Sequence, residues 1–167
     1  MSRTFALTIP VLPERLAQVV ANAYLVCRLA DTIEDDVGLD HRRKSEFHRR
    51  LVAIVRGEEP AELFTAELLP LLSSRTSADE RELVAGTATV IRVTASFSAA
   101  ERLALTRCVS IMCAGMPEFQ RRKSSRGLKD IAEMNDYCYV VAGVVGDYEW
   151  GFHDDVKPLF IAEAGHS

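Results

Sequence analysis

Apolar residues recur three and four positions apart along most of the chain, which is the spacing of one face of an α-helix. The first such segment runs from Pro13 to Asp35, and Pro13 suits a first helical turn because proline lacks the N–H that would be unpaired there. The spacing predicts further helices over residues 40–56 and 60–72, one opening at Ser77, and two more over 99–119 and 128–148. Since no alternating run is long enough for a sheet, the pattern predicts an all-α chain of about six helices.

Several predicted helices carry recognisable end signals. Asp40 is a plausible N-cap for the second helix and Gly57 its stop signal. Segments 77–80 and 98–101 both read S-x-x-E, the capping box in which the serine and glutamate side chains satisfy the first backbone N–H groups. Each box therefore predicts a helix start. The basic segment from Arg121 to Arg126 predicts a loop.

Composition narrows the class of protein. The 167 residues hold 20 Lys and Arg against 24 Asp and Glu, and this net charge of −4 argues against a general nucleic-acid binder. The longest near-apolar stretch, residues 16–30, contains polar residues and falls short of a membrane span. No secretory signal is evident at the start, so we interpret the chain as cytoplasmic. The four cysteines lack a CxxC spacing and lie in apolar patterns, which predicts buried thiols.

The candidate chemistry lies near the end of the first helix. At about 100° per residue, Tyr24, Arg28, Asp31 and Asp35 fall on a stripe about 60° wide. Two carboxylates one turn apart suit Mg²⁺, Arg28 suits a phosphate oxygen, and Glu34 adds charge at the edge. The alternative is a solvated helix end. However, acidic residues are unfavourable at a helix C-terminus, so this cluster requires a compensating cation.

A second candidate lies on the last predicted helix, in residues 136–146. Tyr137 leads an apolar run that contains Gly143 and Gly146. A helical glycine costs about 1 kcal/mol relative to alanine, so two of them indicate that something approaches the backbone closely. Plain packing against another helix and an apolar ligand such as a hydrocarbon chain both remain open.

The other polar clusters are less informative. We interpret the basic residues within 42–50 as a solvated face, and those within 121–126 as a solvated face or part of a flap over an anionic ligand. The histidines are scattered among polar residues, without a zinc motif or a nucleophile partner, which supports neither zinc nor triad chemistry. They are His41, His48, His153 and His166.

Five ordered segments together resemble the squalene/phytoene synthase family, in a form closer to squalene synthases. They are residues 2–5, 24–28, 31–35, 115–119 and 137–146. The resemblance covers about residues 1–146, which we interpret as the N-terminal part of the family fold. It leaves 147–167 as an atypical tail, for which disorder and foreign sequence are the two interpretations. It implies an isoprenoid-synthase-type helical bundle.

The resemblance also implies a reaction. Two farnesyl diphosphates would condense head to head through a cyclopropylcarbinyl diphosphate to squalene, with Mg²⁺ assisting the loss of diphosphate and NADPH reducing the rearranged cation. A phytoene or dehydrosqualene synthase, without the reduction, is the alternative within this class.

Site residues follow from the resemblance by position. The Mg²⁺ ligands would be Asp31, Glu34 and Asp35. The catalytic residues would be Tyr24, Arg28 and Tyr137. The substrate contacts would be Ser2, Arg3, Phe5, Val141, Ala142 and Gly143, and the NADPH phosphates would meet Arg3 and Arg28.

The chain departs from the family in one respect. Family members carry a second aspartate-rich motif on a later helix, whereas Asp154 and Asp155 lie in a tail broken by glycine and proline. We therefore expect a chain truncated at its C-terminus, by a frameshift or a premature stop. An inactive module that binds prenyl diphosphate, and a fragment stable only as an oligomer, stay open as alternatives. Membrane contact would be peripheral, for product release.

Overall fold

The computed structural model describes residues 14–123, and their side chains up to residue 115. This part holds six α-helices, one short 3-10 helix and no strand, which confirms the all-α prediction. The elements are α2 (Glu14–Asp35), α3 (His41–Arg56), α4 (Ala61–Leu68), η2 (Leu69–Leu71), α5 (Ala78–Ala85), α6 (Thr87–Ala95) and α7 (Ala99–Lys123). The helix predicted over 128–148 and the tail 147–167 lie outside the described residues.

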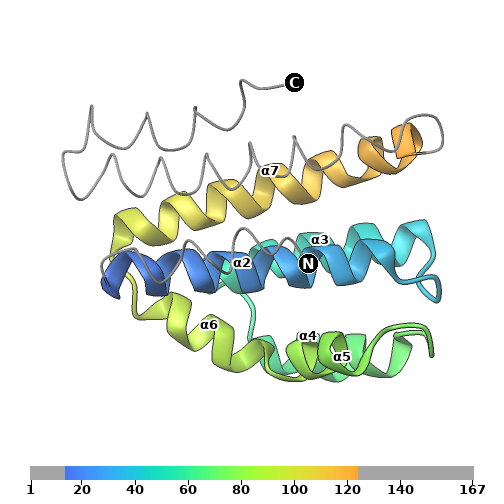
Figure 1. The fold of residues 1–167 in the computed structure, drawn as a ribbon, viewed down its shortest axis with the longest axis horizontal. Coiled ribbons are helices and arrows are strands. Elements are labelled where there is room, and N and C mark those ends of the chain that lie inside the picture. The colour runs from blue at the N-terminus through green and yellow to red at the C-terminus, as the bar shows by residue number, and fades with distance from the viewer. Residues whose placement is uncertain (1–13, 124–167) are drawn as a thin grey trace, which may run out of the picture.

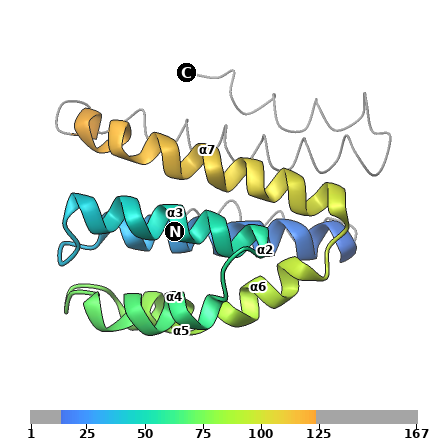
Figure 2. The same ribbon diagram turned by 180° about the vertical axis from the view of Figure 1, so that it is seen from behind.

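The described helices form three layers. α2 and α3 lie side by side in the middle, α7 covers one side, and α4, α5 and α6 cover the other (Figure 1). The view from behind shows the same order, with α3 in front of α2 (Figure 2). Within residues 14–123 no helix is both long and apolar enough to cross a membrane.

The core explains why α2 is the central element. Its buried residues Val26, Leu29 and Ile33 belong to one apolar cluster with Leu51 of α3 and Leu105 of α7. Burying one such side chain contributes roughly 1.5–3 kcal/mol relative to leaving it exposed, so the layers are held through α2.

The predicted helix-end signals at Asp40, Gly57, Ser77 and Ser98 are confirmed. The Asp40 carboxylate accepts from the Arg43 amide at 2.8 Å, and Gly57 ends α3 in the left-handed conformation at φ 78°. A complete capping box opens α5 at Ser77. At the start of α7, the Ser98 amide donates to the Glu101 carboxylate at 2.7 Å, and the Glu101 amide donates to the Ser98 hydroxyl at 3.2 Å.

Two boundaries differ from the prediction. The helix that opens at Ser77 divides at Gly86 into α5 and α6, where the Thr87 hydroxyl turns back to donate to the Val84 carbonyl at 2.7 Å. α7 continues past residue 119 to Lys123, so residues 121–123 are helical and not part of a loop. Arg and Lys are good helix formers, and a run of charge alone does not end a helix.

The basic residues of α3 do not all lie on a solvated face, which corrects the prediction for residues 42–50. Arg42, Arg43 and Arg49 are exposed, but His48 and Arg50 are buried. α3 packs against α2 and α7 as well as α4, so several of its faces are covered at once.

The prediction of buried thiols is confirmed for two of the cysteines. Cys108 and Cys113 are buried, Cys27 is partly buried, and none of these three forms a disulfide within the described residues. Cys138 lies outside the described residues.

Candidate functional site

The α2 stripe, defined as Tyr24, Arg28, Asp31 and Asp35, retains in the structure the order that helical spacing predicts. Tyr24, Arg28 and Asp31 are partly buried and Asp35 is exposed. The stripe thus passes from the partly covered middle of α2 to its solvent-exposed C-terminal end.

Arg28 links two carboxylates from different helices. Its Nη1 donates to Asp31 Oδ2 at 3.4 Å within α2, and its Nη2 donates to Glu80 Oε1 of α5 at 3.3 Å. Both contacts are long for charge-assisted hydrogen bonds, which are usually 2.7–2.9 Å. The exposed fractions of the three side chains are 36% for Arg28, 17% for Asp31 and 30% for Glu80, so water still reaches the cluster. The guanidinium therefore stays accessible to an anion.

Glu80 is fixed to the start of α5 by its capping box. Its Oε2 accepts from the Ser77 amide at 3.0 Å and from the Ser77 hydroxyl at 2.8 Å. These hydrogen bonds lower the pKa of Glu80, with a smaller lowering by Arg28, against the effects of burial and of the Asp36 charge. Glu80 is consequently a fixed anion beside Arg28 at neutral pH.

Asp36 is also part of the acidic cluster, but its contacts are structural. Its carboxylate accepts from the Gly38 amide at 2.7 Å, from the Ser73 amide at 2.8 Å, and from the Thr76 hydroxyl. Burial raises the pKa of Asp36, yet these hydrogen bonds outweigh it and leave the pKa below its usual value. Asp36 therefore ties the end of α2 to the loop that precedes α5.

Glu34 is buried and lies toward α3. Its Oε2 is 3.9 Å from Nδ1 of His48, too long for a hydrogen bond, and its backbone carbonyl accepts from the Lys44 ammonium. His48 Nε2 lies 3.1 Å from the Ala30 carbonyl, a bond that raises its pKa, but burial lowers it more and the nearby Lys44 charge adds to the lowering. His48 is thus neutral. Its contact with Glu34 is polar and is not an ion pair.

The cation expected at the acidic end of α2 is supplied in part by the protein itself. Lys44 donates to a carbonyl in the last turn of α2, and Arg28 lies beside Asp31. Among residues 14–123, no group of three or more His, Cys, Asp and Glu side chains is arranged to hold a metal ion. Asp31 and Asp35 offer two carboxylates from one helix face, and the role of Glu34 as a third ligand stays a prediction.

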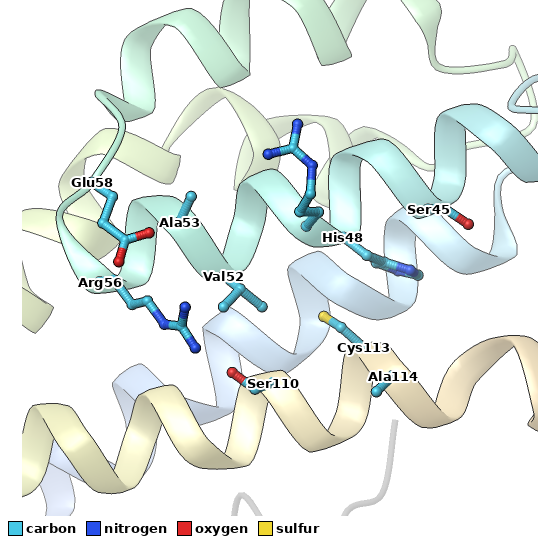
Figure 3. Close-up of a pocket in the computed structure, with 10 residues that line it drawn as sticks. Ser45, His48, Val52, Ala53, Arg56, Glu58, Ser110, Cys113 and Ala114 are labelled. Atoms are coloured by element: carbon cyan, nitrogen blue, oxygen red, sulfur yellow. The ribbon is translucent and has the colours of Figure 1, made fainter.

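A groove of about 430 Å³ lies between α3 and α7 (Figure 3). His48 and Val52 line it from α3, and Ser110 and Cys113 line it from α7. No residue of the α2 stripe lines this groove. Within the described part of the chain, the groove and the stripe are therefore separate features.

The remaining sequence-predicted residues lie outside the described part of the chain. Ser2, Arg3 and Phe5 precede the described residues, and Tyr137 and the segment 141–143 follow them. Conversely, sequence reasoning missed Glu80 as a neighbour of Arg28. The S-x-x-E motif identified Glu80 as a capping residue, but no local signal connects it with a side chain 52 positions earlier.

Comparisons with known proteins identify the family. The model of the family described as squalene/phytoene synthase matches residues 1–155. The chain belongs to the squalene/phytoene synthase family. No solved structure shows significant similarity to it.

Several curated relatives are squalene synthases. Squalene synthase clz20 of Cochliobolus lunatus is 28% identical over 146 residues, which cover 87% of this chain and 33% of that protein. The squalene synthase of Schizosaccharomyces pombe is 27% identical over 148 residues, which cover 87% of this chain and 30% of that protein. Squalene synthase LSS of Botryococcus braunii is 28% identical over 155 residues, which cover 88% of this chain and 29% of that protein. The chain thus spans about a third of the length of these relatives.

Proposed function

We propose that this chain acts as a squalene synthase-type prenyltransferase, joining two farnesyl diphosphates head to head through a cyclopropylcarbinyl diphosphate to give squalene. The observation that carries the proposal is the α2 stripe, in which Arg28 lies 3.4 Å from Asp31 in a chain of the squalene/phytoene synthase family. A guanidinium beside carboxylates on one helix face is a suitable receptor for a diphosphate bound together with a metal ion.

Asp31 and Asp35 are the proposed magnesium ligands. The donor set fits the metal because Mg²⁺ commonly takes one or two carboxylates and completes its octahedron with water and substrate phosphate. When bound, the ion would neutralise charge on the departing diphosphate. Glu34 could join as a ligand only by turning away from His48, so its contribution is proposed mainly as negative charge behind the other two carboxylates.

Arg28 is the proposed diphosphate contact. Because its contacts with Asp31 and Glu80 are both long and its side chain is 36% exposed, exchanging one carboxylate for a phosphate oxygen costs little. Tyr24 lies one turn before Arg28 on the same stripe, where its phenol is proposed to serve the same end of the substrate.

The other proposed roles rest on the resemblance. Tyr137 would orient the reacting carbons or take a proton, and residues 141–143 would line the prenyl channel. Ser2, Arg3 and Phe5 would contact substrate, and Arg3 with Arg28 would meet the NADPH phosphates. A dry apolar channel is required because water would trap the carbocation. A phytoene or dehydrosqualene synthase would share these residues and omit the reduction. The description of the matched family names squalene and phytoene synthase together.

The test is a product assay on the purified chain. Farnesyl diphosphate is incubated with Mg²⁺, with and without NADPH, and released pyrophosphate and C30 product are measured. Squalene that depends on NADPH supports the proposal, and a dehydrosqualene-type mass in both conditions supports the alternative. If the folded protein releases no pyrophosphate, the proposed enzymatic activity is contradicted. Calorimetric Mg²⁺-dependent binding without consumption would then identify a prenyl-diphosphate-binding module.

A further inference from the structure

Glu80 is the carboxylate from outside α2 that contacts Arg28 in the described residues. Its Oε1 accepts from Arg28 Nη2 at 3.3 Å, while its Oε2 is held by the Ser77 amide and hydroxyl. α5 in turn packs against α2. The guanidinium is therefore connected, through one side chain, to the backbone at the start of a neighbouring helix.

The two carboxylates beside Arg28 differ in what else they would do. Asp31 lies on the same helix as Arg28, three residues later, and is a proposed ligand of the metal ion. When Asp31 binds a cation, its interaction with Nη1 weakens because its oxygens are shared. Glu80 is engaged only by Ser77 and Arg28 in the contacts described above, so its hold on Nη2 persists.

We propose that Glu80 is a positioning residue of the diphosphate site, which keeps the Arg28 guanidinium over the α2 stripe while Asp31 is engaged by a divalent cation. The inference rests on the proposed function, in which Arg28 binds diphosphate. Glu80 does not touch the substrate. It limits the orientations that Arg28 can adopt, and so lowers the entropy that binding must remove.

The negative charge of Glu80 and its positioning of Arg28 would affect pyrophosphate binding in opposite directions. A carboxylate near an anion site repels pyrophosphate, so Glu80→Gln should tighten anion binding if Glu80 acted only through its charge. If Glu80 positions Arg28, the same substitution should weaken binding, because an amide holds the guanidinium less strongly than a carboxylate does. The sign of the change therefore separates the two roles.

The experiment is a calorimetric titration of the full chain with inorganic pyrophosphate in the presence of Mg²⁺. We expect Glu80→Gln to weaken binding by roughly 3- to 10-fold. Glu82→Gln removes the same charge from an exposed position of α5 and should stay within about twofold of wild type. Ser77→Ala removes the hydroxyl that holds Glu80 Oε2 but keeps the Ser77 amide, so it should lower the melting temperature and weaken pyrophosphate binding by less than Glu80→Gln does.

A double substitution tests whether Glu80 acts on pyrophosphate affinity through Arg28. In an Arg28→Gln background, Glu80→Gln should change pyrophosphate affinity by less than about twofold, because no guanidinium remains to be positioned. An equal loss in both backgrounds, or tighter binding by Glu80→Gln in the wild-type background, would overturn the proposal.

A second readout does not depend on ligand binding. Carbon-detected NMR measures rotation about the Nε–Cζ bond of Arg28, which should be several-fold faster in Glu80→Gln than in wild type and unchanged in Glu82→Gln. If the wild-type chain binds no pyrophosphate, the proposed function fails, and this rotation still decides whether Glu80 positions Arg28. Equal rotation rates in wild type and Glu80→Gln would refute the positioning role.

Discussion

Arg15, in the first turn of α2, forms a two-point ion pair with Glu101, in the first turn of α7. Arg15 Nε donates to Oε1 at 3.1 Å and Nη2 donates to Oε2 at 2.6 Å. The guanidinium also lies 5.2 Å from the centre of the Phe97 ring. The two long helices therefore begin at the same end of the bundle, as Figure 1 shows.

Removing the charge of Glu101 should destabilise the fold. The side chain is 1% exposed and accepts both from Arg15 and from the Ser98 amide, so Glu101→Gln should lower the free energy of unfolding by about 1–3 kcal/mol. Arg15 remains hydrated in the variant because 41% of its side chain is exposed. Urea unfolding measures the loss. The exposed Glu82→Gln should change stability by less than about 0.5 kcal/mol, and equal effects of the two variants would contradict the expectation.

Acid should weaken the tie between α2 and the loop before α5. Hydrogen bonds keep the pKa of Asp36 below its ordinary value of 3.8 despite burial. A carboxylate whose pKa is depressed by folding contributes stability above its unfolded pKa, and this contribution is lost as pH falls through the folded pKa. Asp36→Asn should therefore be less stable than wild type at pH 7, and the gap should narrow below about pH 4. Melting temperatures from pH 7 to pH 3 test this, and a constant gap would contradict it.

Arg50 should not tolerate lysine. It donates from Nε to Glu59 and from Nη1 to Glu67, each at 2.7 Å, and its guanidinium lies 5.5 Å from the centre of the Phe47 ring. Lysine offers neither the planar fork nor the stacking, so Arg50→Lys should cost about 1–2 kcal/mol in the free energy of unfolding. Arg49→Lys, at the exposed neighbouring position, is the matched control in thermal unfolding. A similar loss in both variants would argue against a specific network.

Cys113 should be chemically inert in the folded protein. Burial raises the pKa of its thiol to about 12, with smaller contributions from Cys108 and from the carboxylates of Asp31 and Glu34. Because the thiolate is the reactive form, iodoacetamide at pH 8 should leave Cys113 unmodified and should label it after denaturation. Mass spectrometry of the digested protein locates the label. Modification of native Cys113 as fast as a free cysteine would contradict this prediction.

The carboxylates at the end of α2 should differ in their effect on magnesium. Asp31→Asn and Asp35→Asn should each weaken Mg²⁺-dependent pyrophosphate binding by about tenfold or more, because each removes a proposed ligand. Glu34→Gln should weaken it by less than about threefold, since Glu34 lies against His48. Calorimetry with and without Mg²⁺ measures the three changes. An effect of Glu34→Gln as large as that of Asp31→Asn would show that Glu34 turns to the metal.

The sequence by itself determined the helical class, most helix ends and the face that carries the candidate chemistry. These features depend on residues within four positions of one another, such as Ser77 with Glu80 or Asp31 with Asp35, and helical geometry fixes such relations without knowledge of the fold. The family resemblance was likewise readable, because its motifs are short and ordered along the chain.

Only the tertiary structure decided which polar side chains meet across helices. It placed Glu80 beside Arg28, turned Glu34 toward His48, and buried Arg50 in a stretch that looked solvated. Each of these contacts joins different helices, and the layer order sets which faces are covered. A helical period specifies the face on which a residue lies, but the partner of that face depends on packing around the shared apolar core of α2, α3 and α7.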